Sequence, residues 1–153
     1  METNEKINDL LNELVQINND RIEGYERAGK ETEDSDLKSL FTAMASKSRL
    51  LKSELGSEIT NRGGKYTEGT TTSGKAFRVW MDLKAAMTGK DRKAILTSCE
   101  FGEDAALETY DKVLESKNDL PANLISLISQ QRQKLDHDHK QVKTLRDTVM
   151  HAI

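Results

Sequence analysis

The sequence has few of the residues that break helices, cross-link chains or fill large cores. Its 153 residues include one proline, Pro121, one cysteine, Cys99, and only 5% aromatic residues. A single cysteine excludes an internal disulfide, which is typical of a protein in a reducing compartment. The first residues, METNEKINDLLNELVQ, lack the charged-then-apolar build of a signal peptide, and no apolar run is long enough to span a membrane. We therefore expect a cytoplasmic protein without a membrane partner.

A strong excess of charge of one sign is also missing. Lysine and arginine together number 23 against 26 for aspartate and glutamate, which gives a net charge of −3. Because nucleic-acid binding needs a basic surface, we expect no nucleic-acid partner. Charged residues make up 32% of the chain and hydrophobic residues 35%. These proportions, at this length, predict one helical domain over residues 1–153 with a modest core and a charged surface.

Apolar residues recur at intervals of three and four residues in four long segments, which is the period of an amphipathic helix. The first helix is expected to begin close to the N-terminus. The second has a capping residue at Ser35 and stops at Gly63 and Gly64. Asp91 is expected to cap the third helix, and Pro121 lies in the first turn of the fourth. No alternating, strand-like pattern competes with this assignment.

A long connection separates the second helix from the third. Its first part, residues 61–74, is rich in glycine and threonine and predicts a flexible loop. A shorter helix with Phe77 and Trp80 on one face follows and ends at Gly89. The other two connections are short and join antiparallel neighbours. Two helical hairpins joined by one long crossover predict an all-α, ferritin-like four-helix bundle whose crossover contains a short extra helix.

Several polar residues fall inside the apolar stripes when each residue is placed at 100° per step around its helix. Because buried polar groups need partners, we expect these residues to form a network at the centre of the bundle. The Arg21 guanidinium can form a bidentate pair with Glu103 or Asp138, or alternatively lie at the edge of its stripe and extend to water. The expected network contains Asn18, Arg21, Ser48, Glu103, Gln131 and Asp138.

Three motifs together resemble those of one protein family. The stretches INNDRIEGYERA, GKAFRVWMDLKAAMTGKD and SCEFGEDAALETY are similar to an uncharacterised bacterial family of ferritin-like four-helix bundles, described as a domain of unknown function. The resemblance covers nearly the whole chain, and it implies the fold but no activity. That family often has histidine before the arginine of its HR-x-W motif, where this chain has Phe77 before Arg78.

A more distant resemblance links the chain to ferritin-like carboxylate proteins that bind two metal ions. Those proteins often place an inward glutamate in the first helix of each hairpin and Glu-x-x-His in the second. This chain keeps one such glutamate, Glu103, has Asn18 at the other position, and lacks Glu-x-x-His in its second helix, SLFTAMASKSRLLKSEL. We therefore expect no metal cofactor. The alternative is an atypical iron or manganese site around Glu103, Asp138 and His139.

Two local patterns have two interpretations each. Residues 134–141, KLDHDHKQ, contain two acids and two histidines within the fourth helix. We interpret them as a solvated, ion-paired surface, because residues two apart do not share a helix face, and a metal site is the alternative. Trp80 is expected to anchor the crossover helix in the core, whereas Arg78 beside it can instead form part of a binding surface.

Three classes of function remain open. The first is a ferritin-like bundle without enzymatic activity that acts through its surface as an accessory or stress-associated protein. The second is a metal-binding oxidoreductase or metal-handling protein that uses the atypical site around Glu103, Asp138 and His139. The third is a homo-oligomer that pairs through a helix face. The sequence favours the first class because two of the four helices lack metal ligands at their inward positions.

Overall fold

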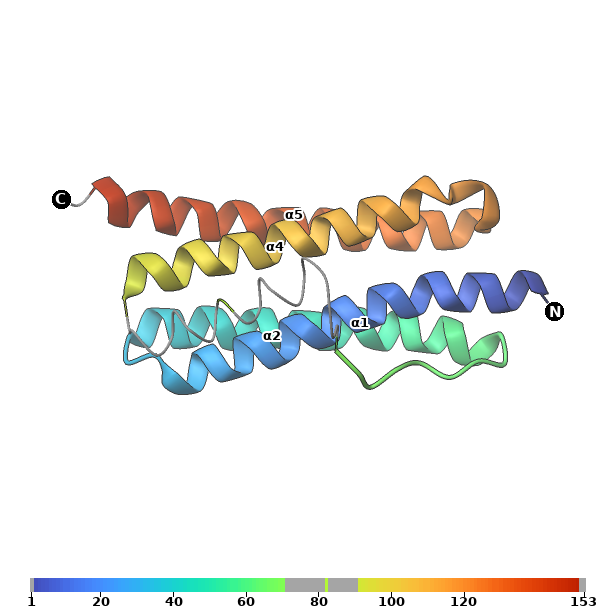
Figure 1. Ribbon diagram of the computed structural model, residues 1–153, viewed down its shortest axis with the longest axis horizontal. Coiled ribbons are helices and arrows are strands. Elements are labelled where there is room, and N and C mark those ends of the chain that lie inside the picture. Colours follow the sequence, from blue (N-terminus) through green and yellow to red (C-terminus); the bar gives the residue numbers. More distant parts are fainter. Residues whose placement is uncertain (1, 71–81, 83–90, 152–153) are drawn as a thin grey trace.

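The computed structural model describes residues 2–70, 82 and 91–151. These residues form four long helices and no strand, so the predicted all-α bundle is confirmed (Figure 1). The helices are α1 (Glu2–Glu31), α2 (Ser35–Asn61), α4 (Arg92–Glu115) and α5 (Ala122–His151), with the short 3-10 helix η1 (Lys117–Asp119) before α5.

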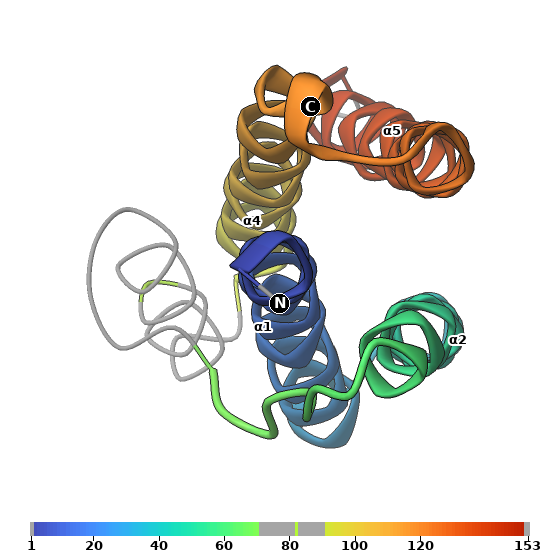
Figure 2. The ribbon, with the colours of Figure 1, turned by 90° about the vertical axis from the view of Figure 1, so that its right-hand side faces the viewer.

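The long helices form two antiparallel hairpins. Helix α1 packs along α2, α4 packs along α5, and α1 also packs against α4. Figure 1 shows that α2 and α4 run in the same direction, so the connection between them has to return along the length of the bundle. The end-on view in Figure 2 shows α1 and α4 side by side, each with its hairpin partner on the same side. This is the predicted arrangement of two hairpins and one long crossover.

The core is divided into two apolar clusters, one towards each end of the bundle. The cluster nearer the N-terminus of α1 includes Leu14, Leu55, Tyr110 and Ile128. The opposite cluster includes Tyr25, Phe41, Cys99 and Val142. Between the two clusters each long helix contributes one buried polar side chain to a set that meets at the centre, and we call these four residues the central layer: Arg21, Ser48, Glu103 and Asp138.

The N-terminus of α4 is capped as expected, but that of α2 is not. The Asp91 carboxylate accepts a hydrogen bond from the backbone N–H of Lys93 at 3.2 Å. In α2 the N-cap residue is Asp34, and Ser35 is already the first helical residue. The Asp34 side chain makes no capping bond, because it accepts a hydrogen bond from Nη1 of Arg92 at 3.0 Å. An ion pair between the two hairpins thus replaces the predicted cap.

Side-chain amides on one face of α1 hold the first part of the crossover. Asn12, Gln16 and Asn19 donate to backbone carbonyls between residues 65 and 70 over distances of 2.9 to 3.1 Å. Asn12 also accepts from the backbone N–H of Thr67 at 2.9 Å. These contacts attach residues 65–70 to α1, and the flexibility of the loop stays a prediction.

Apart from residue 82, the rest of the expected crossover lies outside the described residues, which applies to positions 71–74, to Arg78 and to Trp80. Among the described helices, none combines the length and apolar character needed to cross a bilayer.

Two glycine substitutions should change the stability of the bundle in opposite directions. In Gly64→Ala the new Cβ would lie 2.5 Å from Asn8 Nδ2 and 3.0 Å from Ile59 Cγ2, so we expect a loss of about 1–3 kcal/mol. In Gly29→Ala the nearest side-chain atom, Phe41 Cβ, is 3.7 Å away, and the helix should gain about 0.5–1 kcal/mol. Urea denaturation measures both, and equal effects of the two changes would contradict this packing.

Candidate functional site

The central layer brings one polar residue from each long helix to the middle of the bundle. Arg21, Ser48 and Glu103 are fully buried, and Asp138 is 1% exposed. Positions on the inward face of each helix, between the two apolar clusters, place these side chains opposite one another. An arginine and two carboxylates that are shielded from bulk solvent need partners of opposite charge, because an unpaired buried charge is strongly destabilising.

The Arg21 guanidinium connects α1 to all three other helices. Its Nε and Nη2 atoms donate to Oε1 of Glu103 at 3.2 and 2.8 Å. The Nη2 atom also donates to Oδ2 of Asp138 at 3.1 Å, and Nη1 donates to the Ser48 hydroxyl. Arg21 therefore does not extend to water, and it binds both candidate carboxylates. The expected bidentate geometry is not found, because both bonds to Glu103 end on the same oxygen.

Tyr25 adds a further donor to the same carboxylate oxygen. Its hydroxyl donates to Oε1 of Glu103, and its ring centroid lies 5.5 Å from Cζ of Arg21. Burial raises the pKa of Tyr25 well above its usual value, and the charge of Glu103 raises it further. For Arg21, burial alone would lower the pKa, but the charge of Glu103 above all outweighs this effect and keeps it above its usual value. Both groups thus keep their protons at neutral pH.

A lysine from the rim balances the charge of the layer. Lys47 Nζ lies 2.6 Å from Oδ1 of Asp138, and the lysine side chain is 36% exposed while the carboxylate is buried. Arg21 and Lys47 then offset Glu103 and Asp138, two positive charges against two negative. Helical periodicity does not predict the inward position of the Lys47 ammonium group, because the Cα of Lys47 lies off the apolar stripe, next to Ser48. The signal that could have found it is the length of its side chain, which can reach inward from the edge of a stripe.

A second chain of hydrogen bonds contains the other two expected residues, Asn18 and Gln131. The Asn18 amide donates to the Tyr110 hydroxyl at 2.9 Å, and this hydroxyl donates to Oε1 of Gln131 at 2.7 Å. The Gln131 amide in turn donates to the carbonyl of Leu51 at 3.2 Å and to Oε1 of Glu54 at 3.1 Å. The six expected residues thus form two chains of bonds at neighbouring levels of the bundle.

Residues 6–116 match the family described as "Domain of unknown function (DUF2383)". The chain belongs to this family. Among solved structures, a mutant of Dps1 from Mycobacterium smegmatis has a similar fold, with a TM-score of 0.77 and 14% sequence identity, over 95% of this chain and 97% of that chain. The comparison with curated proteins found no match. The predicted membership of an uncharacterised family with a ferritin-like fold is confirmed.

In this DUF2383 chain the three residues of the alternative metal site do not lie together. Glu103 and Asp138 meet at Arg21, whereas His139 lies at the edge of the α4–α5 pair. His139 Nε2 is 2.7 Å from Oδ1 of Asp104 and 3.9 Å from Oε1 of Glu100. Across residues 2–70, 82 and 91–151, no group of three or more histidine, cysteine, aspartate or glutamate side chains is placed to hold a metal ion.

The pattern KLDHDHKQ separates into three environments. His137 is exposed, and Asp136 forms an ion pair with Lys140 across one helical turn at 2.9 Å. The hydrogen bond from Lys140 lowers the pKa of Asp136. Asp138 instead enters the central layer, and His139 is partly buried and lies against Asp104 of α4. This short stretch thus combines solvated surface residues with one buried carboxylate, that of Asp138, which binds Arg21.

Arg21 is expected to stabilise the bundle through its two carboxylates. Arg21→Ala should lower the free energy of unfolding by on the order of 3–5 kcal/mol, because it strands buried charges. Double-mutant cycles that pair Arg21 with Glu103 and with Asp138 should each give a coupling above about 0.5 kcal/mol. The exposed pair Arg132–Asp111 serves as the control and should couple by at most about 1 kcal/mol. Smaller coupling in both central cycles would falsify the network.

The free energy of unfolding should fall in alkaline solution, because three buried groups stay protonated in the folded protein and ionise when it unfolds. Burial raises the pKa values of Cys99, Tyr25 and Tyr110 in the folded protein, whereas in the unfolded chain the thiol ionises near pH 8.5 and the phenols near pH 10. Their stabilising effect is complete below these unfolded values and is lost as pH rises towards the folded ones. Each group adds a slope of about 1.4 kcal/mol per pH unit.

Urea midpoints measured between pH 8 and 11 test this slope. Cys99→Ala should flatten the decline in the interval about pH 9–10, where the thiol contributes and the phenols do not yet do so. A stability that stays constant throughout this range, or an unchanged slope in the variant, would contradict the assignment.

Proposed function

We propose that this protein is a ferritin-like bundle without a di-metal centre, and that it acts through its surface as an accessory or stress-associated protein of the cytoplasm. One observation carries the proposal. The guanidinium of Arg21 occupies the middle of the bundle and binds both inward carboxylates, Glu103 and Asp138. The positive charge at the centre thus comes from the chain itself.

The donor set of the central layer does not fit a pair of iron or manganese ions. Such a pair needs about four carboxylates and two histidines directed inward. Here α1 supplies Arg21 and α2 supplies Ser48, and a hydroxyl is a weak ligand. The bound oxygens of the two carboxylates already accept hydrogen bonds from Arg21, and Asp138 also pairs with Lys47. A metal ion at this position would lie against a guanidinium, and the repulsion would be large in a low dielectric.

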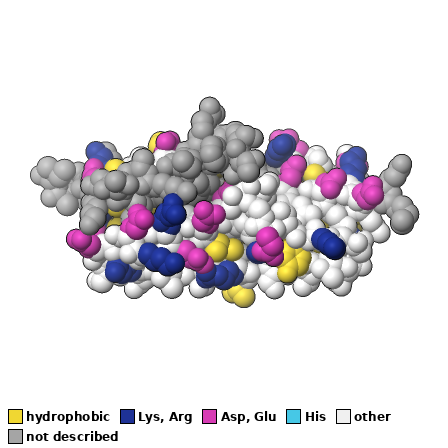
Figure 3. Space-filling view, turned by 60° about the horizontal axis from the view of Figure 1, so that its bottom comes forward, with side chains coloured by type: hydrophobic (Ala, Val, Ile, Leu, Met, Phe, Trp, Pro, Cys, Tyr) yellow, Lys and Arg dark blue, Asp and Glu magenta, His cyan; other side chains and the backbone are white. Residues whose placement is uncertain are grey.

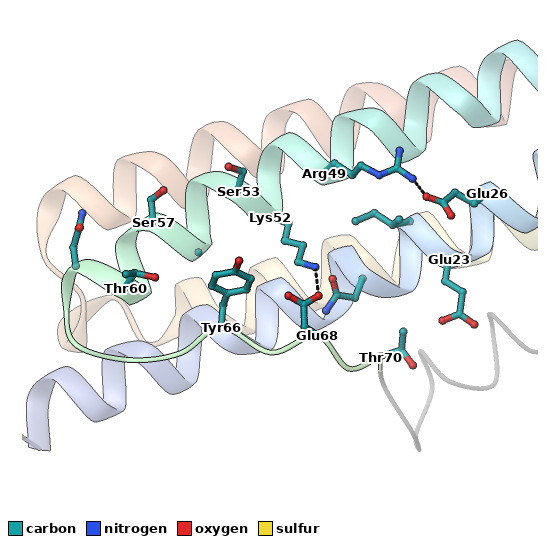
Figure 4. A pocket seen from close by; sticks show the side chains of 14 residues that line it. Glu23, Glu26, Arg49, Lys52, Ser53, Ser57, Thr60, Tyr66, Glu68 and Thr70 are labelled. Atoms are coloured by element: carbon teal, nitrogen blue, oxygen red, sulfur yellow. Dashed lines mark hydrogen bonds and ion pairs between the residues drawn. The ribbon is translucent and has the colours of Figure 1, made fainter.

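The surface offers a groove for the proposed role. It has a volume of about 670 Å³ and lies between α1, α2 and the bound part of the crossover (Figure 4). Tyr66 lies over Gly56, where an added Cβ would be 3.1 Å from the ring, and Lys52 pairs with Glu68 at 2.9 Å. A volume of this size is within the range of small-ligand sites.

Self-association through a helix face is a second candidate for the surface role. Leu50 on α2 and Phe101 on α4 are large hydrophobic residues with 68% and 54% of their surface exposed. On the face shown in Figure 3, acidic and basic side chains are interspersed and hydrophobic ones are scattered. Sedimentation velocity at several protein concentrations distinguishes a monomer from an assembly of this kind.

Metal analysis separates the proposal from the metal-binding alternative. Protein purified without chelators should contain no stoichiometric iron or manganese, and added ferrous iron should show no saturable oxidation beyond a buffer control. Manganese should leave the melting temperature of the wild type unchanged. In Arg21→Ala the carboxylates lose their cation, so manganese should raise the melting temperature there, while Arg132→Ala serves as the matched control. Two ions per chain that are lost in Glu103→Ala would overturn the proposal.

A further inference from the structure

Two buried oxygens at the centre of the bundle have no hydrogen-bond donor among the described residues. They are Oε2 of Glu103 and Oδ1 of Asn18, and both residues are fully buried. The other oxygen of Glu103 accepts bonds from Arg21 and Tyr25, and the Asn18 amide nitrogen already binds Leu14 and Tyr110. Buried polar atoms in folded proteins are nearly always bonded, so each of these acceptors calls for a donor from outside the chain.

The two acceptors belong to neighbouring turns of one helix interface. Asn18 and Arg21 are three residues apart on α1, so they lie on the same face of the helix. Across the interface, Arg21 binds Glu103 and Asn18 binds Tyr110, and both of these partners belong to α4. The missing donors are therefore needed between α1 and α4, within the region that the central layer and the Asn18 chain enclose.

The charge of the layer decides what kind of donor fits. Arg21 and Lys47 balance Glu103 and Asp138, so the centre is neutral without any further ion. A metal ion or an alkali cation would leave an uncompensated positive charge in a buried site, and an anion would face two further acceptors. A small neutral hydrogen-bond donor leaves the charge unchanged, and water is such a molecule.

We propose that the centre of the bundle binds at least one enclosed water molecule, which donates hydrogen bonds to Glu103 Oε2 and Asn18 Oδ1. This inference rests on the proposed function, because a metal ion at the same place would take these oxygens as ligands. The water is the one part of the polar centre that the chain does not supply. It completes the hydrogen bonding of a carboxylate that Arg21 approaches from one side only.

Lys47 determines that the ligand is water and not a cation. Replacing it with methionine leaves one negative charge in excess at Asp138, and a potassium-sized cation then becomes the better ligand of the same oxygens. Lys140 provides a matched control, since it also pairs with an aspartate through Nζ, at 2.9 Å, but is 73% exposed. The variants to compare are therefore Lys47→Met and Lys140→Met.

A crystal structure of the wild type grown with rubidium chloride tests the proposal directly. The expected result is a water-sized density peak without anomalous signal, within hydrogen-bond distance of Glu103 Oε2 or Asn18 Oδ1. An empty centre with Arg21 in place would overturn the water and leave the proposed function standing. A transition-metal signal with Arg21 displaced would overturn both. A rubidium signal in the wild type would overturn the charge argument, whereas in Lys47→Met that signal is expected and in Lys140→Met it is not.

Oxygen-17 relaxation dispersion provides a second test in solution. It counts long-lived internal waters and does not depend on exchange of hydroxyl protons. Asn18→Leu removes one acceptor and should lower the count by about one water per chain. Asn12→Leu changes an asparagine of the same helix near the surface and should leave the count unchanged. An equal count in the wild type and in Asn18→Leu would contradict the proposed water, and a wild type without any long-lived water would do so even if the variant fails to fold.

Discussion

The burial of one guanidinium is the constraint on which the rest of the bundle depends. Arg21 lies on α1 with no exposed surface, and it can stay there only if three other helices direct acceptors towards it. Ser48, Glu103 and Asp138 fulfil this need, one from each helix. A shift of any helix by one residue would rotate its acceptor away from the centre, so the layer fixes the register of all four helices. The apolar clusters on either side would tolerate such a shift far better, because their contacts are not directional.

Such a layer contributes more to specificity than to stability. Moving two carboxylates and an arginine out of water has a large desolvation penalty, and their electrostatic attraction is only slightly larger than this penalty. The favourable energy of the fold comes mainly from the apolar clusters, in which Leu14, Leu55 and Ile128 are fully buried. The layer instead penalises alternatives, since any packing that separates Arg21 from Glu103 leaves two unpaired charges in the interior. The amide contacts from α1 to residues 65–70 act in the same way on the crossover.

The sequence predicts the skeleton of this site but not its completion. A 100° rotation per residue is enough to direct Asn18, Arg21 and Glu103 inward, because helices of this length keep a regular period. Lys47 and Glu54 are not found in this way, since long side chains reach the centre from Cα positions outside the stripe. The geometry at Glu103 also depends on competition, because Tyr25 and two guanidinium nitrogens share one oxygen. The helical pattern predicts which residues pair, but it does not predict that three donors bind the same carboxylate oxygen.

A bundle with inward carboxylates can neutralise them in two ways. Metal ions from solution give reactive centres, but the stability of the fold then depends on the metal concentration through the free energy of binding. A guanidinium supplied by the chain is present at every concentration, and it stays charged at every pH at which the protein folds. The same property removes reactivity, because a guanidinium has no open coordination position and no second oxidation state. A four-helix bundle that adopts this solution keeps its architecture while its own side chains neutralise the inward carboxylates.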